Sequence, residues 1–200
     1  MIYLVVKRFL DISISIIGLV FLILLLPFVF ILIKSLGGFG PLFYKARRVS
    51  MGKIFYIYKF RTMKNGASEL KKDLSHLNER DDGPFFKISL DPRVTVAGKI
   101  LRKFWIDELP QLYNVLKGEI SLVGPRPYEP EEIEKYPKDY KFLKYEKAGI
   151  TGLSQINGSS NLPFKKVLEY DSYYAKHKSL KLDLYILCRT FLLIFNPSGV

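Results

Sequence analysis

Residues Leu101–Pro127 read LRKFWIDELPQLYNVLKGEISLVGPRP. We interpret the rest of the chain as structural support for this stretch. Pro110 is typical of the first turn of a helix, where its missing N–H has no intrahelical partner. The apolar residues after it recur at helical spacing, and Gly118 is a typical helix end. The adjacent carboxylates Asp107 and Glu108 are therefore expected at or just before a helix N-terminus. Free N–H groups and the helix dipole hold a carboxylate ionised there.

Cationic side chains flank this acid pair in the sequence. They are Arg102, Lys103, Lys117 and Arg126, the last of them within the rigid turn Gly124–Pro127. Carboxylates beside fixed cations and free N–H groups suit phosphate chemistry, with Mg²⁺ bridging carboxylate and phosphate oxygens. The alternative is an ordinary helix start, in which Asp107 is only an N-cap and Glu108 a first-turn acid. The dipeptide alone favours this alternative, and the neighbouring sequence reverses the preference.

The composition of the chain points to an anionic partner. Its 200 residues carry 31 Lys and Arg against 19 Asp and Glu, a net charge of +12, which is typical of proteins that bind phosphates, nucleic acid or a phospholipid surface. A single cysteine, Cys188, excludes an internal disulfide, and with only two histidines no Cys/His metal cluster is expected. We expect one domain with an appendage, facing the cytosol.

The segment Ile12–Ile33 is long and apolar enough to cross a bilayer. A spanning helix normally has its Lys and Arg biased toward one side, but here Lys7 and Arg8 precede the segment and further basic residues follow it. Pro27 lies inside the segment and is expected to kink the helix. We therefore favour a re-entrant helix–break–helix in residues 1–36, with both basic flanks against anionic headgroups. The alternative is a single span in which the proline is tolerated.

Two strands are predicted directly after the apolar segment. They cover Leu42–Arg48 and Ile54–Phe60 and flank a turn at Ser50–Gly52. From Lys34 to Lys72 the chain has ten Lys or Arg and one acid, interleaved with aromatic residues. Such a pattern can bind single-stranded nucleic acid by stacking, or it can lie at a membrane interface. Because the pattern follows a membrane segment, we favour the interface and expect no nucleic-acid partner.

The remaining chain predicts a mostly helical α+β fold, a small domain with one short β-hairpin. Helices are expected at Ser68–Arg80, from the cap Thr95 through Lys103, at Phe164–His177 and at Leu180–Phe195. The last helix is apolar on most faces, so it packs in the core or lies on the membrane surface. The acidic cluster Glu129–Glu134 is expected to be a solvated helix start. The loop Gly149–Gly158 has glycines spaced for a close backbone approach, with Gln155 and Asn157 as candidate polar contacts, although such loops also occur as plain turns.

Six short motifs follow one another along the chain. They are Lys59–Met63 (KFRTM), Asp91–Thr95 (DPRVT), Leu101–Lys103 (LRK), Asp107–Leu112 (DELPQL), Ser121–Pro127 (SLVGPRP) and Gly149–Gly152 (GITG). In this order they resemble the bacterial sugar transferases, the monotopic phosphoglycosyl transferase superfamily. One such motif is a weak signal, whereas six in order over nearly the whole chain are a strong one. The resemblance is to the minimal catalytic form, without the extra membrane spans or fused domains of larger members.

The resemblance implies a re-entrant membrane helix in residues 1–36 and a catalytic domain in residues 37–200, on the cytoplasmic face of the bacterial inner membrane. It also implies the reaction, a transfer of a substituted phosphate group. A nucleoside-diphosphate sugar, usually a UDP-sugar, gives its phospho-sugar to polyprenyl (undecaprenyl) phosphate and releases UMP. This reaction is the first membrane step of glycoconjugate biosynthesis.

The family's acid pair corresponds to Asp107 and Glu108. Asp107 would be the covalent nucleophile on the sugar-bearing phosphorus and the ligand of Mg²⁺, while Glu108 would position the metal or the acceptor. Arg102 and Arg126 are candidate phosphate clamps, because guanidinium groups suit phosphate oxygens. Weaker substrate-binding candidates, for which a salt bridge that only stabilises the fold is the alternative, are Lys59, Arg61, Gln155 and Asn157.

Two positions depart from the family pattern. Trp105-Ile106 precede the acid pair where Ser-Leu is more common, and Ser159 and Ser160 stand where an Arg commonly follows Asn-Gly. A phosphate contact from that loop is therefore in doubt. The sequence leaves open the sugar, the glycan pathway and the oligomeric state, with a homodimer among the alternatives. A second class of function also stays open, a non-enzymatic basic membrane protein that binds anionic lipid or nucleic acid through Lys34–Lys72.

Overall fold

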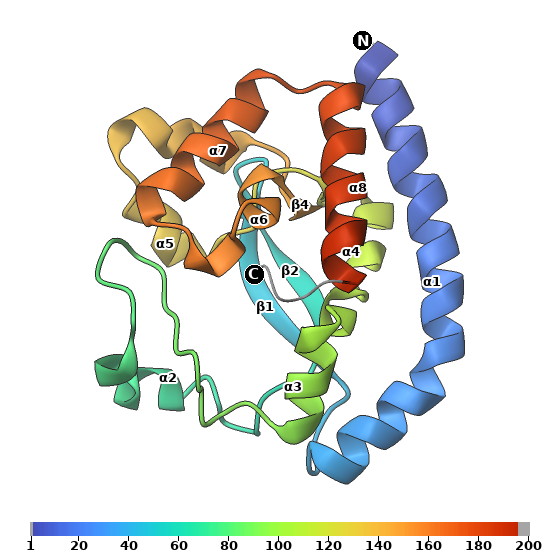
Figure 1. Ribbon diagram of the computed structural model, residues 1–200, viewed down its shortest axis with the longest axis vertical. Helices are drawn as coiled ribbons and strands as arrows, with labels where there is room; N and C mark the ends of the chain where they lie inside the picture. The colour runs from blue at the N-terminus through green and yellow to red at the C-terminus, as the bar shows by residue number, and fades with distance from the viewer. Residues whose placement is uncertain (1, 196–200) are drawn as a thin grey trace.

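A β-hairpin and a short pair of parallel strands form the centre of the fold, and helices pack around them (Figure 1). The computed structural model describes residues 2–195. The elements in chain order, with η for 3-10 helical turns, are α1 (Ile2–Leu36), β1 (Phe43–Ser50), β2 (Lys53–Phe60), α2 (Leu70–Asp73), η1 (Ser75–Leu77), α3 (Val96–Lys103), η2 (Ile106–Glu108), α4 (Gln111–Lys117), β3 (Ser121–Val123), α5 (Pro130–Glu134), η3 (Lys138–Tyr145), β4 (Gly149–Thr151), α6 (Leu153–Ile156), η4 (Ser159–Asn161), α7 (Phe164–Lys176) and α8 (Leu180–Phe195). The predicted α+β class is confirmed.

The N-terminal helix α1 continues through Pro27 without interruption over 35 residues. Its axis bends in the second half, so the predicted kink is present (Figure 1). The predicted break into two helices was wrong. Proline removes one backbone hydrogen bond and pushes away the carbonyl one turn earlier, but the bonds on either side can hold the helix together.

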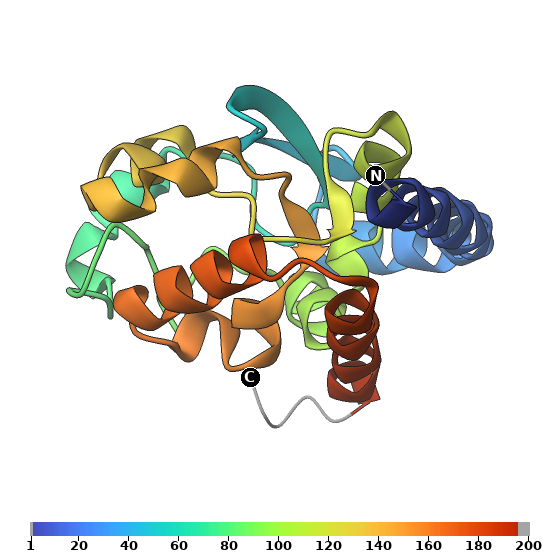
Figure 2. The ribbon, with the colours of Figure 1, turned by 90° about the horizontal axis from the view of Figure 1, so that it is seen from above.

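One stripe of α1 packs against the domain along the length of the helix. Leu22, Val29 and Ile33 are buried in a cluster with Phe60 and Leu101, and Figure 2 shows the helix lying along one side of the molecule. Most of the remaining apolar side chains of α1 are exposed. By length and composition, α1 qualifies to cross a membrane.

The predicted hairpin is confirmed, with β1 and β2 antiparallel and Ser50 paired with Lys53 next to the turn. Its inner face joins the main core through Ala46, Phe55 and Ile57, which pack with apolar residues of α4, α6, α7 and α8. Asn114 of α4 fixes the helix to the hairpin, because its side chain accepts a hydrogen bond from the Tyr58 N–H and donates one to the Tyr56 carbonyl. The hairpin thereby positions the segment that carries the acid pair.

The helix predicted at Ser68–Arg80 was wrong. Only the single turns α2 and η1 form there, and neither buries a residue. Leu70 and Leu77 stay exposed, so the apolar stripe gains no burial that would stabilise a longer helix. By contrast, α3 forms as expected, with the Thr95 hydroxyl accepting a hydrogen bond from the Gly98 N–H at 3.0 Å. The helices α7 and α8 also match their predictions.

A parallel pairing of β3 with β4 was not predicted, because three-residue strands carry no recognisable periodicity. A Cβ atom on Gly149 would lie 2.1 Å from the Gly124 backbone nitrogen, so the two segments can approach only through glycine. The predicted close approach at Gly149–Gly152 is therefore real, and it brings the chain against its own backbone. It fixes the Gly124–Pro127 turn, which carries Arg126.

Candidate active site

The acid pair lies on a strained turn between two helices. Trp105 has a backbone φ of 55°, in the left-handed region, and it is followed by η2, which contains Asp107 and Glu108, and then by α4. A bulky residue is costly in this region, and such strain is often found at functional sites. The acid pair thus lies just before a helix N-terminus, as predicted. The C-terminal end of α4 also follows the prediction, with Gly118 in the left-handed conformation.

Asp107 is buried, with only 8% of its surface exposed. Burial raises the pKa of its carboxyl to about 6, and the neighbouring negative charge of Glu108 acts in the same direction, against Lys59 and Arg102. With this pKa Asp107 is still largely ionised at neutral pH, as expected, although its pKa lies above the ordinary value for Asp. Loss of water around the carboxylate outweighs the surrounding positive charges.

The pKa of Glu108 is shifted in the opposite direction to that of Asp107. The Oε1 of Glu108 accepts a hydrogen bond from the Lys59 ammonium at 2.5 Å, and both side chains are mostly covered. Burial acts to raise the pKa of Glu108, but Lys59 and Arg126 bring it below its ordinary value. The two neighbouring acids thus differ, with Glu108 ionised at neutral pH and Asp107 able to gain a proton in mild acid.

Two arginines predicted as phosphate clamps lie near this pair. Arg102 is fixed by a hydrogen bond from its Nε to the Thr62 hydroxyl at 3.0 Å, and its charge acts on Asp107. Arg126 is exposed, and within residues 2–195 its guanidinium makes no hydrogen bond or ion pair, although its charge stabilises ionised Glu108. Both guanidinium groups therefore retain N–H donors for a ligand.

A hollow of about 100 Å³ opens beside Arg126. We call it the Arg126 hollow, and its polar and aromatic lining includes Arg80, Phe85, Lys87, Arg126, Ser154 and Gln155. The Gln155 amide donates to the Ile150 carbonyl at 3.2 Å, while its buried Oε1 has no hydrogen-bond partner among the described residues. Arg80 is already paired with the Asp82 carboxylate at 2.9 Å. Arg126 and Lys87 are therefore the cations of the hollow that suit a phosphate group of a ligand.

Arg80, Phe85 and Lys87 were not predicted as candidates, because they lie in an irregular loop without a motif. The contact of the Arg80 guanidinium with the Phe85 ring, 5.2 Å from its centroid, exists only in the folded chain. Below the hollow, fully buried Asp171 accepts hydrogen bonds from the Ser154 hydroxyl at 2.7 Å and the Tyr128 hydroxyl at 3.0 Å. Burial raises the pKa of Asp171 to about 7.

Two predicted substrate-binding residues are engaged elsewhere. Arg61 is buried and donates from its guanidinium to the Phe39 carbonyl at 2.7 Å and the Gly38 carbonyl at 2.6 Å. Asn157 donates to the Leu153 carbonyl at 2.8 Å and does not line the Arg126 hollow. In both cases the side chain completes the backbone bonding of a turn, so the structure favours the stabilising role over the substrate contact.

The basic side chains near the start of α1, Lys7 and Arg8, also bind protein atoms. The Lys7 ammonium lies 2.8 Å from an Asp183 carboxylate oxygen, and Arg8 donates to the carbonyls of Val115 and Leu116 at 2.6 and 2.7 Å. These bonds tie α1 to the end of α4 and to α8. Pro27 is on the exposed side of the helix. Contact of these residues with headgroups stays a prediction.

The acid pair is the candidate metal ligand. Among residues 2–195, no group of three or more Asp, Glu, His or Cys is placed to hold a metal ion. Mg²⁺ often takes only one or two protein carboxylates, completed by water and substrate phosphates. Because Glu108 is paired with Lys59, Asp107 is the better ligand of the two. The donor set therefore fits Mg²⁺ bound together with a diphosphate.

The chain is similar to known proteins over most of its length. A family model described as "Bacterial sugar transferase" matches residues 2–197. The galactosyl transferase CpsE of Streptococcus agalactiae is 42% identical over 98% of this chain and 44% of its own length. The undecaprenyl-phosphate galactose phosphotransferase of Salmonella typhimurium is 39% identical over 80% of this chain and 34% of its own length. The UDP-galactose-lipid carrier transferase of Erwinia amylovora is 36% identical over 96% of this chain and 42% of its own length. The chain thus spans less than half the length of each of these three relatives.

Proposed function

We propose, since the chain belongs to the bacterial sugar transferase family, that it transfers a phospho-sugar to a polyprenyl phosphate at a membrane. The donor is a nucleoside-diphosphate sugar, specifically a UDP-sugar, and the acceptor is undecaprenyl phosphate. Relatives named for galactose transfer to undecaprenyl phosphate or from UDP-galactose to a lipid carrier support this assignment.

The observation that carries the proposal is the buried carboxylate of Asp107, with a pKa of about 6, beside cationic groups suited to phosphate. An oxygen of ionised Asp107 attacks the sugar-bearing phosphorus, and the bond from that phosphorus to the bridging oxygen breaks. UMP leaves with the electron pair, and the phospho-sugar stays on Asp107. A phosphate oxygen of the polyprenyl phosphate then attacks the same phosphorus and releases the carboxylate.

The other residues hold the reactants. Lys59 keeps Glu108 ionised, so Glu108 is available to orient the acceptor or the metal. Arg102 and Arg126 bind phosphate oxygens, and the Arg126 hollow takes part of the nucleotide, with Gln155 as a polar contact. Asp107 would hold Mg²⁺, and the metal would neutralise the negative charge that develops on the departing UMP.

The packing of α1 supports a re-entrant arrangement on the cytoplasmic face of the inner membrane. Near its start, Asp11 accepts hydrogen bonds from the Ser121 hydroxyl and the Leu122 N–H, both at 3.0 Å. Near its end, Ile33 is fully buried against the same domain. Because both ends of the bent helix contact one domain, both lie on the same side of the membrane in this arrangement. Cysteines introduced at Leu4 and Lys45 should then both be labelled from the cytosolic side, whereas labelling from opposite sides would show a span.

Release of UMP tests the reaction. Purified protein is incubated with Mg²⁺, undecaprenyl phosphate and a panel of UDP-sugars, and we expect UMP that depends on acceptor and metal. Asp107→Asn, nearly isosteric but a poor nucleophile, should abolish it, while the exposed control Asp139→Asn should retain it. A fully active Asp107→Asn variant would reject the covalent role. The non-enzymatic lipid-binding protein would be favoured by two results together. The wild type would release no UMP with any donor, and charge reversal in Lys34–Lys72 would abolish membrane binding.

A further inference from the structure

A second hollow, of about 110 Å³, lies where the first turns of α1 meet β3 and the end of α7. We call it the Lys147 pocket, and its lining includes Leu4, Lys7, Arg8, Lys147, Tyr174 and Lys178. It is separate from the acid pair. Arg8 of this pocket binds carbonyls at the C-terminal end of α4, whereas Asp107 and Glu108 precede the N-terminal end of the same helix.

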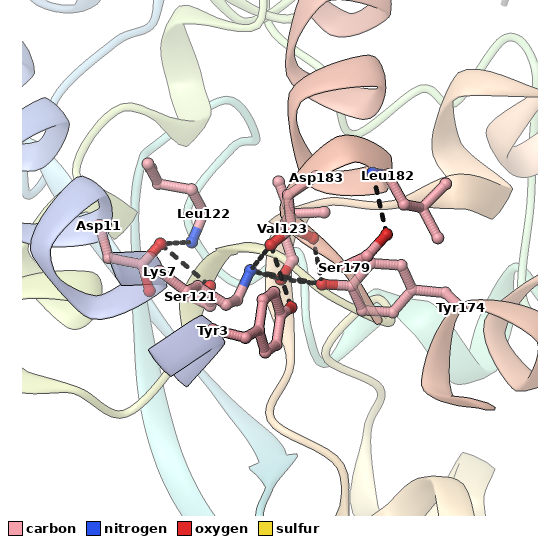
Figure 3. A network of polar contacts seen from close by, with 10 residues as sticks. All are labelled: Tyr3, Lys7, Asp11, Ser121, Leu122, Val123, Tyr174, Ser179, Leu182 and Asp183. Atoms are coloured by element: carbon pink, nitrogen blue, oxygen red, sulfur yellow. Dashed lines mark hydrogen bonds and ion pairs between the residues drawn. The ribbon is translucent and has the colours of Figure 1, made fainter. Parts of the chain in front are cut away.

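Most charged groups around the pocket are already paired. Figure 3 shows the Lys7 ammonium among the Asp183 carboxylate, the Val123 carbonyl and the Tyr174 hydroxyl, at 2.8, 3.0 and 3.3 Å. Asp11 accepts two hydrogen bonds from the start of β3, as described above. At the outer edge, Lys178 forms an ion pair with Glu146. The charges of Lys7 and Lys178 are thus balanced by neighbouring acids.

Lys147 differs from Lys7 and Lys178 in its partners. It is partly buried, and within residues 2–195 its ammonium makes no hydrogen bond or ion pair. Burial and the positive charges of Arg8 and Lys7 lower its pKa, while the charge of Asp11, which also lines the pocket, acts in the opposite direction and offsets only part of this shift. An anion entering the pocket would gain a charge-assisted bond to Lys147 and would relieve its repulsion with Arg8.

The surface of α1 next to the pocket is apolar. Leu4, Val5 and Phe9 expose 64, 65 and 69% of their surface. An occupant that matches both features carries an anionic head for the pocket and an apolar tail for the helix. A soluble phosphate satisfies only the first feature, so the observations favour a lipid.

We propose that the Lys147 pocket binds the phosphodiester headgroup of an anionic glycerophospholipid, whose acyl chains lie along the exposed face of α1. The site rests on the membrane placement proposed above, and it adds a contact that the transfer reaction does not use. It would fix the depth and orientation of α1 in the leaflet, because Arg8 and Lys7 connect the pocket to α4 and α8.

Binding of short-chain phosphatidylglycerol to the full chain in a neutral detergent tests this site. Loss of one lysine contact near a membrane surface weakens binding on the order of fivefold, so Lys147→Met should lose about this factor. Lys147→Arg should retain the affinity, and so should Lys165→Met, a matched control at an exposed lysine of α7. The UMP assay without phosphatidylglycerol should be unchanged in Lys147→Met, which separates failure of this site from failure of the transferase assignment.

Two results would overturn the proposal. One is equal phosphatidylglycerol affinity of Lys147→Met and the wild type, with both proteins folded by thermal unfolding. The other is binding of soluble glycerol 3-phosphate at this pocket as tight as that of the lipid, because the apolar face of α1 would then contribute nothing.

Discussion

Replacing Lys59 by Met should change the pH dependence of turnover more than it changes the maximal rate. The Lys59 ammonium lies 2.5 Å from Glu108 Oε1, and its charge also opposes the rise in the pKa of Asp107. Methionine keeps the apolar length of the side chain and removes the charge. Without it, both carboxyls of the acid pair lose a stabilising charge, so the pair should take up its first proton at a higher pH.

The size of the change follows from the pKa of about 6 for Asp107. Removing an opposite charge at this range raises the pKa of a carboxyl by about one unit, which brings it to about 7. At pH 6 the ionised fraction then falls from about one half to about one tenth, an approximately fivefold loss of kcat/KM. At pH 8.5 nearly all of the carboxylate is ionised in both proteins, so the loss should almost disappear.

The assay is UMP release at low donor concentration from pH 5 to 9. Lys59→Arg, which keeps the positive charge, should retain the acidic limb of the wild type. If Lys59→Met lost activity by the same factor at every pH, Lys59 would act on substrate alone, and our account of the acid pair would be wrong.

Three further predictions concern the support of the site. Asp91→Asn leaves buried Arg93 without its carboxylate partner, at 2.6 Å in the structure, and should lower the free energy of unfolding by roughly 3 kcal/mol. Because Arg93 lowers the pKa of Asp91, this stabilisation is present at neutral pH and is lost as the pH falls through that lowered pKa, so wild type and variant should converge in acid. Thr95→Ala removes the cap of α3 and should cost about 1 kcal/mol, while Thr95→Ser should retain most of the stability. Arg126→Met should raise the KM for the donor about tenfold with little change in stability, because the exposed guanidinium makes no hydrogen bond or ion pair within residues 2–195.

Thermal and denaturant unfolding in detergent at neutral and acidic pH would measure the first two effects, and steady-state kinetics the third. Equal stability of Asp91→Asn and the wild type at pH 7 would show that the ion pair contributes nothing. An unchanged donor KM in Arg126→Met would remove Arg126 from the binding site.

Local sequence signals predicted the elements that present the acid pair. Pro110 and Gly118 predicted the limits of the helix after it, and Thr95 marked the start of α3. The turn at Ser50–Gly52 between two strand stretches predicted the hairpin. These signals act within a few residues, so they are readable without the fold. The helix predicted at Ser68–Arg80 failed because its stability depended on a partner surface that the fold does not supply.

The chemistry of the site depends on residues that the fold brings together from distant segments. It could therefore not be predicted from the sequence. Asp107 was expected to be ionised, and the rise of its pKa to about 6 depends on how completely the fold excludes water from it. Likewise Arg61 belongs to a conspicuous motif, yet its guanidinium is used by the turn after α1. Lys147 belongs to no motif, and only the fold places it beside Lys7 and Arg8.

The intact mass of the protein after incubation with a donor UDP-sugar alone, without polyprenyl phosphate, tests the central claim most directly. Covalent catalysis predicts a mass increase equal to one phospho-sugar, located on Asp107, with an equal amount of UMP and no increase in Asp107→Asn. An unmodified wild-type protein that releases UMP only when the acceptor is present would contradict the claim, because the acceptor would then attack the donor directly.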